Sequence, residues 1–223
     1  MIPLLKLENI HKIYSTTSVK VHAVNDVSFE IFPGTLTLLM GPSGSGKTTL
    51  LSIMGCILKP SEGRLTVIDR QVDWVERTLP LIRRNNFGFI FQHFNLISAL
   101  NARENVEVAL NLKGLSGKTA SQKAKEMLTA VGLSKRIEFF PTDMSGGEKQ
   151  RVAIARALCM DPPIILGDEP TGNLDSLTGI SIIEVLKKLA KEEKKSVVIV
   201  THDVRLISLA DRVINMEDGR VII

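Results

Sequence analysis

The sequence predicts an α/β fold on the basis of two observations. Short apolar runs rich in β-type residues alternate with amphipathic helical patterns, which is typical of a sheet covered by helices. A glycine-rich segment at residues 41–48 lies between one apolar run and a helical pattern, in the order strand, loop, helix. The 223 residues are long enough for a well-buried core that needs no disulfides.

Eight apolar runs are predicted to form strands, at residues 4–10, 27–31, 36–40, 65–68, 88–91, 164–167, 197–201 and 212–216. The segment from about residue 101 to 158 differs, because helical periodicity dominates it. We therefore expect a single domain over residues 1–223. Residues 1–100 and 161–223 would form its α/β core, with an N-terminal β part, and residues 101–160 an inserted helical lobe.

Composition and charge narrow the class of partner. The chain has 28 Lys and Arg against 24 Asp and Glu, a net charge of +4 that is spread along the sequence, and only 4% aromatic residues. Neither feature indicates nucleic acid binding. The densest basic cluster, residues 187–195, is predicted to be a solvated helix face. Cys56 and Cys159 are predicted to be buried free thiols, and no apolar run approaches the roughly 18 residues that span a bilayer.

Residues 41–48 read GPSGSGKT and match the phosphate-loop pattern G-x-x-x-x-G-K-[ST] at every fixed position. Lys47 would place a cation at the β- and γ-phosphates, and the Thr48 hydroxyl would bind Mg²⁺. Glycine is expected because a Cβ would obstruct the turn and the approach of phosphate. The predicted nucleotide-binding residues are Gly41, Pro42, Ser43, Gly44, Ser45, Gly46, Lys47, Thr48 and Thr49.

Two further strands are predicted to end in polar side chains beside this loop. The strand at residues 164–167 is followed by Asp168 and Glu169. Asp168 would orient Mg²⁺ through its water shell, and Glu169 would polarise a water for attack on the γ-phosphate. His202 follows the strand at residues 197–201 and would hydrogen-bond the γ-phosphate.

A second phosphate-binding surface is predicted at residues 144–148, which read MSGGE and open a long helical pattern. Ser145 and Glu148 form an S-x-x-E capping box, but a cap alone does not require Gly146 and Gly147. A serine and two glycines at a helix N-terminus expose N–H donors to an external anion. Since residues 41–48 already cradle one phosphate group, we expect this surface to meet the nucleotide of another copy of the chain.

These motifs, in this order and over nearly the whole chain, resemble the ATP-binding cassette (ABC) family. GPSGSGKT is similar to the Walker A loop, IILGDE to Walker B, and MSGGE to the signature motif usually written LSGGQ. The resemblance implies that Gln92 touches Mg²⁺ and the attacking water, that residues 173–176 form the D-loop, and that Tyr14 stacks on adenine. Met144 keeps the volume of the usual leucine, whereas Glu148 adds a carboxylate.

The resemblance also implies an ATPase that uses ATP and Mg²⁺, with a second copy of the chain and an integral membrane permease as partners. Such a chain would lie peripherally on the cytoplasmic face of the membrane. MSGGE, EPTGNLDS and FQHFNLI resemble the lipoprotein-release and macrolide-export branch. An ABC ATPase that signals across the envelope without transport, and an importer subunit, remain alternatives. Residues 94–100 would either form a groove for a partner's cytoplasmic helix or pack in the core.

Overall fold

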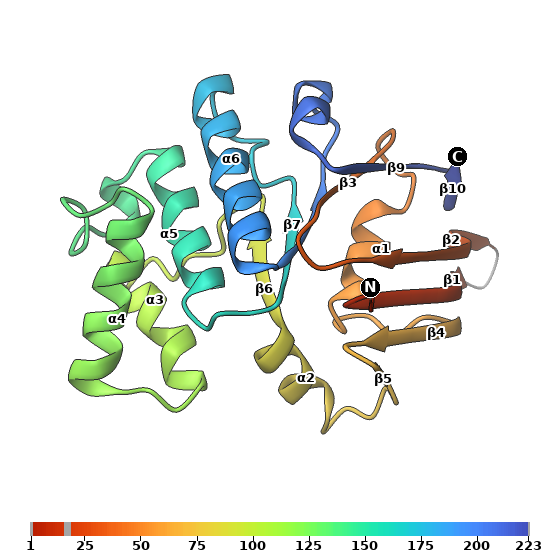
Figure 1. Cartoon of the computed structure of the whole chain (residues 1–223), viewed down its shortest axis with the longest axis horizontal. Helices are drawn as coiled ribbons and strands as arrows, with labels where there is room; N and C mark the ends of the chain where they lie inside the picture. The colour runs from red at the N-terminus through yellow and green to blue at the C-terminus, as the bar shows by residue number, and fades with distance from the viewer. Residues whose placement is uncertain (1, 16–18, 223) are drawn as a thin grey trace.

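The computed structural model describes residues 2–15 and 19–222, and these form two sheets (Figure 1). The smaller sheet is antiparallel and has the order β2 (Lys20–Ile31), β1 (Leu5–Ser15), β4 (Glu62–Val67), β5 (Arg70–Gln71). The larger has the order β10 (Arg220–Ile222), β9 (Arg212–Glu217), β3 (Leu36–Met40), β8 (Ser196–Val200), β7 (Ile164–Asp168), β6 (Phe87–Phe91). Strands β9 to β6 are parallel and β10 is antiparallel to β9.

The helices cover the larger sheet and form a separate lobe. Helix α1 (Lys47–Met54) contacts strands of both sheets, and α2 (Leu79–Asn86) leads into β6. Helices α3 (Ala102–Leu112), α4 (Gly117–Ala130) and α5 (Gly146–Leu158) pack together at one end of the molecule, with the short 3-10 helix η1 (Pro141–Asp143) before α5 (Figure 1). Helix α6 (Ser176–Glu193) precedes β8, and the 3-10 helix η2 (Val204–Leu209) follows it. Within residues 101–160, all of them described, no strand occurs, as predicted.

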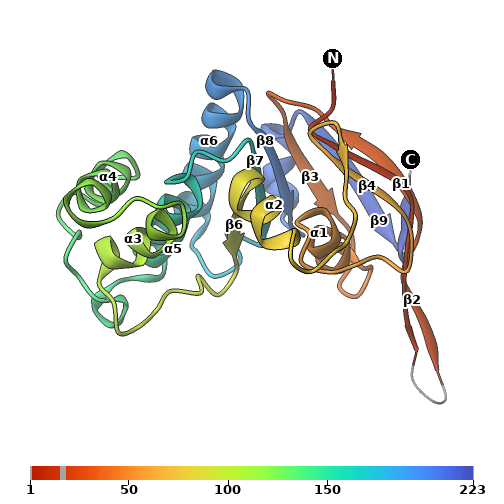
Figure 2. The same ribbon diagram turned by 90° about the horizontal axis from the view of Figure 1, so that it is seen from below.

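Strands β3, β7 and β8 of the larger sheet are buried on both faces, which explains why they are continuous apolar runs. Alternate residues of β8 enter two different cores. Val197 and Ile199 pack with α5 and α6, whereas Val198 and Val200 pack with α1 and the smaller sheet. Figure 2 shows α1 lying between the strands of the two sheets. The two cores fix the loop that precedes α1 at the carboxyl ends of the parallel strands.

The first two strands are longer than predicted, and bulges explain why. The pairing of β1 with β2 shifts register at three places between Leu7 and Ile13, and Asn9 has a φ of 49°. Bulges break the two-residue period from which strands are recognised. Two short strands, β5 and β10, and helix α2 were not predicted. Helix α2 has no fully buried residue and packs on the core only through the partly buried Leu79 and Ile82.

The prediction that residues 187–195 form a solvated helix face is wrong for Lys195. Lys195 is 8% exposed, and its ammonium pairs with Asp161 and Glu193 and donates to the carbonyl of Pro162 at 3.2 Å. It ties the end of α6 to the point where the chain returns from the helical lobe to β7. A buried lysine with partners cannot be distinguished from its exposed neighbours by local composition.

Two other predictions from composition are confirmed. Cys56 and Cys159 are buried and free, and burial raises the pKa of each thiol to about 12, which makes both poor nucleophiles. In the part of the chain that the structure describes, none of the helices combines the length and apolarity needed to cross a bilayer.

Candidate nucleotide-binding site

The loop after β3 depends on glycine for packing as well as for conformation. Gly41 has a φ of 148°, and a Cβ there would lie 1.9 Å from the carbonyl oxygen of Met216 on β9. Gly46 has a φ of 94°, and its Cβ would lie 1.9 Å from the carbonyl oxygen of Ala23 on β2. The sequence predicted obstruction of the turn; close contact with β2 and β9 is a further reason that only the tertiary structure reveals.

Helix α1 begins at this loop with an open N-terminus. Gly46 is the N-cap, so no side chain caps the helix, and its first turn has no acidic residue. The first N–H groups of a helix lack intrahelical partners, and the helix dipole adds positive potential there. The loop and α1 together can therefore bind an anion such as a phosphate.

The Lys47 ammonium lies inside the loop. Its Nζ donates to the carbonyl oxygens of Gly41 at 2.9 Å and Pro42 at 2.6 Å and to the Ser45 hydroxyl at 3.1 Å. Burial lowers the pKa of Lys47, and the two carboxylates that end β7 act against that shift. The cation is thus held where a phosphate bound to the loop would need it.

Thr48 and Asp168 form a pair of oxygen donors beside Lys47. The Thr48 hydroxyl donates to Asp168 Oδ1 at 3.2 Å. Burial raises the pKa of Asp168, and the hydrogen bond from Thr48 opposes this. Hydroxyl and carboxylate oxygens suit Mg²⁺. Among the described residues no group of three or more His, Cys, Asp or Glu could hold a metal.

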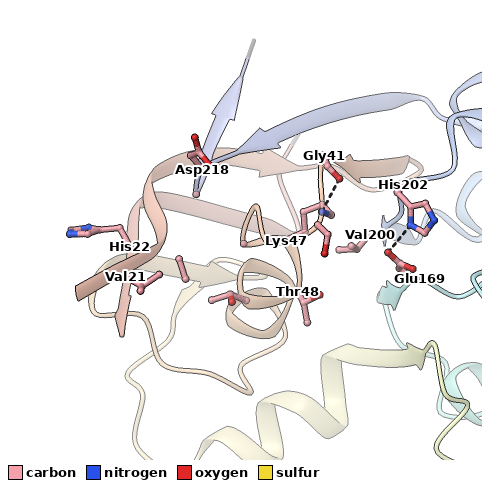
Figure 3. Close-up of a pocket in the computed structure, with 15 residues that line it drawn as sticks. Val21, His22, Gly41, Lys47, Thr48, Glu169, Val200, His202 and Asp218 are labelled. Atoms are coloured by element: carbon pink, nitrogen blue, oxygen red, sulfur yellow. Dashed lines mark hydrogen bonds and ion pairs between the residues drawn. The ribbon is translucent and has the colours of Figure 1, made fainter. Parts of the chain in front are cut away.

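Glu169 and His202 face each other across the ends of β7 and β8. Glu169 Oε1 lies 2.9 Å from His202 Nδ1 (Figure 3). Glu169 has a φ of 44°, a left-handed conformation that is uncommon outside glycine and often occurs at functional sites. The two residues that the sequence singled out on neighbouring strands are therefore in direct contact.

Gln92 lies on the other side of Glu169. Phe91 is paired with Asp168 in the parallel register of β6 and β7, which brings the next residues of both strands to the same edge. A Cβ added to Gly172 would be 3.1 Å from Gln92 Nε2 and 3.2 Å from Glu169 Oε2, so amide and carboxylate flank the same glycine. Asn173 Nδ2 donates to the Gln92 carbonyl at 2.8 Å and ties the D-loop segment to Gln92.

A cavity of about 480 Å³ joins most of these groups (Figure 3). The predicted site residues that line it are Gly41, Ser43, Gly44, Gly46, Lys47, Thr48, Thr49, Glu169 and His202. The remaining wall, which the sequence did not assign, is Val21, His22, Ala23, Val200, Asp218 and Gly219. The Asp218-Gly219 pair is a hairpin signal that could have revealed the turn between β9 and β10. Its contact with the loop, Gly219 N to Ser45 O at 3.1 Å, has no local signal.

Tyr14 flanks this cavity without being part of its lining. It pairs with Val21 across β1 and β2, and directly opposed residues of an antiparallel pair point to the same face. Val21 lines the cavity, so the Tyr14 ring lies on the same side of the hairpin. The ring is 46% exposed, with Lys12 Nζ 5.4 Å from its centroid.

The signature segment lies apart from this cavity. Ser145 is exposed at the N-terminus of α5, and the predicted capping box is confirmed: Glu148 N donates to Ser145 Oγ at 3.3 Å and Ser145 N donates to Glu148 Oε2 at 2.8 Å. None of the described residues that line the cavity belongs to α3, α4 or α5. A Cβ at Gly146 would lie 3.4 Å from the carbonyl oxygen of Asn173, which places the segment beside the D-loop. One chain does not bring Ser145, Gly146 and Gly147 to its own phosphate loop.

A phosphate loop between β3 and α1, with adjacent carboxylates at the end of the parallel strand β7, defines a phosphate-loop nucleotide hydrolase. The family model for ABC transporters matches residues 24–172. The chain therefore belongs to the ABC transporter family and is an ATP-binding ATPase domain of that family, which confirms the resemblance seen in the motifs.

Similar proteins align with nearly the whole chain. An uncharacterised ABC transporter ATP-binding protein of Thermotoga maritima is 44% identical over 97% of this chain and 93% of its own length. The macrolide export ATP-binding/permease protein MacB of Salmonella typhi is 40% identical over 100% of this chain, which corresponds to 34% of MacB. The solved dimeric structure of the ATP-binding cassette MJ0796, in a post-hydrolysis state with ADP and Pi, is 44% identical with a TM-score of 0.91, covering 97% of this chain and 96% of that one.

Proposed function

We propose that two copies of this chain close around two Mg-ATP, and that each nucleotide is held between the phosphate loop of one copy and Ser145, Gly146 and Gly147 of the other. The observation that carries the proposal is the separation of these two anion-binding surfaces within one chain. An exposed helix N-terminus can bind an external anion through its free N–H groups. The dimeric state of the similar MJ0796 cassette supports the same arrangement.

In this proposal each residue in or beside the cavity has a separate role. Lys47 and the N–H groups of α1 bind the β- and γ-phosphates, and Tyr14 stacks on adenine. Glu169 accepts a proton from the attacking water, with His202 and Gln92 holding the water and the γ-phosphate in place. Thr48, Asp168 and Gln92 would hold Mg²⁺, which when bound neutralises phosphate charge. Loss of the γ-phosphate removes the bridge between the copies, and the pair reopens.

Ser145 offers a direct test, because aspartate and asparagine cap helices as well as serine does. Ser145→Asp keeps the cap but puts a negative charge where the partner's phosphate would lie. We expect it to lower ATP hydrolysis by roughly 10²-fold or more, while a single chain binds ATP as before. Ser145→Asn, which caps without charge, is the matched control and should retain far more activity. Equal activity of the two variants would contradict the proposal.

We further propose that the closing pair drives an integral membrane permease of an export system, from the cytoplasmic face of the membrane. MacB, whose name combines ATP-binding and permease functions, supports this. Residues 94–100 offer a contact surface: Phe94, Leu96 and Ser98 line a cavity of about 220 Å³ together with His93, Pro141, Thr142 and Lys149. Leu96 packs against the core, whereas Ile97 beside it is 45% exposed and could contact a partner.

Copurification from the native membrane tests this second proposal. We expect a permease to copurify with the chain and to be lost with Ile97→Asp. Ile222→Asp is the matched control, because Ile222 is equally exposed at 45% but lies at the opposite edge of the larger sheet. A solute-importing permease or a non-transporting membrane protein in place of an export permease would overturn the export assignment.

A further inference from the structure

Glu148 places a carboxylate in the first turn of α5, the turn that the proposed function directs at the partner's ATP. Glu148 Oε2 accepts the backbone N–H of Ser145 at 2.8 Å, which fixes the carboxylate at the helix N-terminus. A negative charge stabilises a helix N-terminus but repels an incoming phosphate. The Glu148 carboxylate therefore stabilises helix α5 but opposes the binding of a phosphate at the same N-terminus.

Arg136, from a different part of the helical lobe, pairs with the Glu148 carboxylate. It lies in the connection between α4 and η1, and its Nε donates to Glu148 Oε1 at 2.7 Å. The two oxygens of Glu148 thus have separate partners, the guanidinium on one side and Ser145 N on the other. Both hydrogen bonds lower the pKa of Glu148, so the carboxylate is charged and matched by the cation.

The guanidinium is held in place by a second contact. Its carbon lies 4.5 Å from the centroid of the Phe139 ring, a cation–π distance. Among the ion pairs of the described residues, Glu148 is the only partner of Arg136. The pair is partly exposed, at 43% for Arg136 and 25% for Glu148, so both side chains reach the surface of the helical lobe.

We propose that Arg136 is a positioning residue for the partner's ATP: it neutralises Glu148 and holds that carboxylate against Ser145 N, so that the Ser145 hydroxyl and the N–H groups of Gly146 and Gly147 face the phosphates without a net negative charge beside them. The Ser145 oxygen accepts the Glu148 N–H, and the hydroxyl hydrogen remains to be donated to a phosphate oxygen. The inference rests on the proposed function, since it concerns closure of two copies.

The test uses Glu169→Gln as the parent chain, in which slow hydrolysis lets the ATP-bound dimer accumulate. Dimer formation is followed by analytical ultracentrifugation as ATP is raised. Arg136→Ala leaves Glu148 uncompensated and should raise the ATP concentration for half dimerisation by about tenfold. Higher salt should reduce this defect, because screening weakens the repulsion.

Rescue separates charge compensation from a merely structural role. Adding Glu148→Gln to Arg136→Ala should restore dimerisation to within about threefold of the parent, because the amide still accepts Ser145 N–H but carries no charge. Lys135→Ala is the matched control: it removes a cation that lines the same 430 Å³ cavity as Arg136 and Glu148 without an ion pair to Glu148. It should behave as the parent.

Each outcome bears on a different claim. Normal dimerisation of Arg136→Ala, or a defect that Glu148→Gln does not rescue, would overturn the inference and leave the proposed function standing. Failure of the Glu169→Gln parent to dimerise with ATP would overturn the proposed function, and this inference with it.

Discussion

Replacement of Glu169 by glutamine is expected to slow ATP hydrolysis by roughly 10²- to 10⁴-fold while ATP still binds. Glutamine keeps the size and the oxygen of the side chain but cannot accept the proton of the attacking water. Glu169 lines the cavity with Lys47 and Thr48, and His202 holds one of its oxygens at 2.9 Å. The change therefore removes the group that accepts the proton and leaves the groups that bind ATP in place.

The same variant should accumulate as a dimer in ATP and remain a monomer in ADP. Steady-state hydrolysis and sedimentation in the two nucleotides measure the two effects. Glu184→Gln, at an exposed position of α6, is the control for the loss of one carboxylate. Turnover of Glu169→Gln at the rate of the native chain would show that another group is the base.

Replacement of Lys47 by alanine is expected to weaken ATP binding by roughly 10²- to 10³-fold. The ammonium is buried in the loop and makes three hydrogen bonds to it, and residues 41–48 contain no other cation that could take its place. Without the ammonium, the loop carbonyls that accepted its hydrogen bonds can bind water instead, because residues 42–44 are exposed. The fold should be little affected.

Equilibrium binding of a fluorescent ATP analogue, with thermal unfolding as a check on the fold, tests this prediction. Lys188→Ala is the matched control, since that side chain is 70% exposed and its ion pair with Glu192 is long at 3.9 Å. Unaltered affinity of Lys47→Ala would mean that the loop does not bind the triphosphate.

The sequence was most informative where function and fold use the same residues. The strands β3, β7 and β8 are buried on both faces and therefore appear as unbroken apolar runs that end in the loop, in Asp168 and in His202. Their parallel pairing brings these ends to one edge, so predicting the strands amounted to predicting which side chains meet. The structure shows Glu169 in direct contact with His202, a pairing that the sequence did not predict.

The rest of the site depends on contacts between distant segments. Val21 reaches the cavity because β2 continues past its bulges, and Gly219 because a hairpin turn packs on Ser45. No local pattern encodes either contact. The pairing of Arg136 with Glu148 joins residues twelve positions apart across an irregular connection, so it too becomes visible only in the fold.

The proposal that ATP is held between two chains is tested most directly by photo-cross-linking from the nucleotide. Two chains of different tag length, both with Glu169→Gln, are mixed with ATP that carries an aryl azide on its γ-phosphate. One chain also has Lys47→Ala and so cannot hold its own nucleotide. We predict that the probe labels residues 145–151 of this Lys47→Ala chain. Labelling confined to the chain with an intact Lys47 would contradict a site shared between two copies.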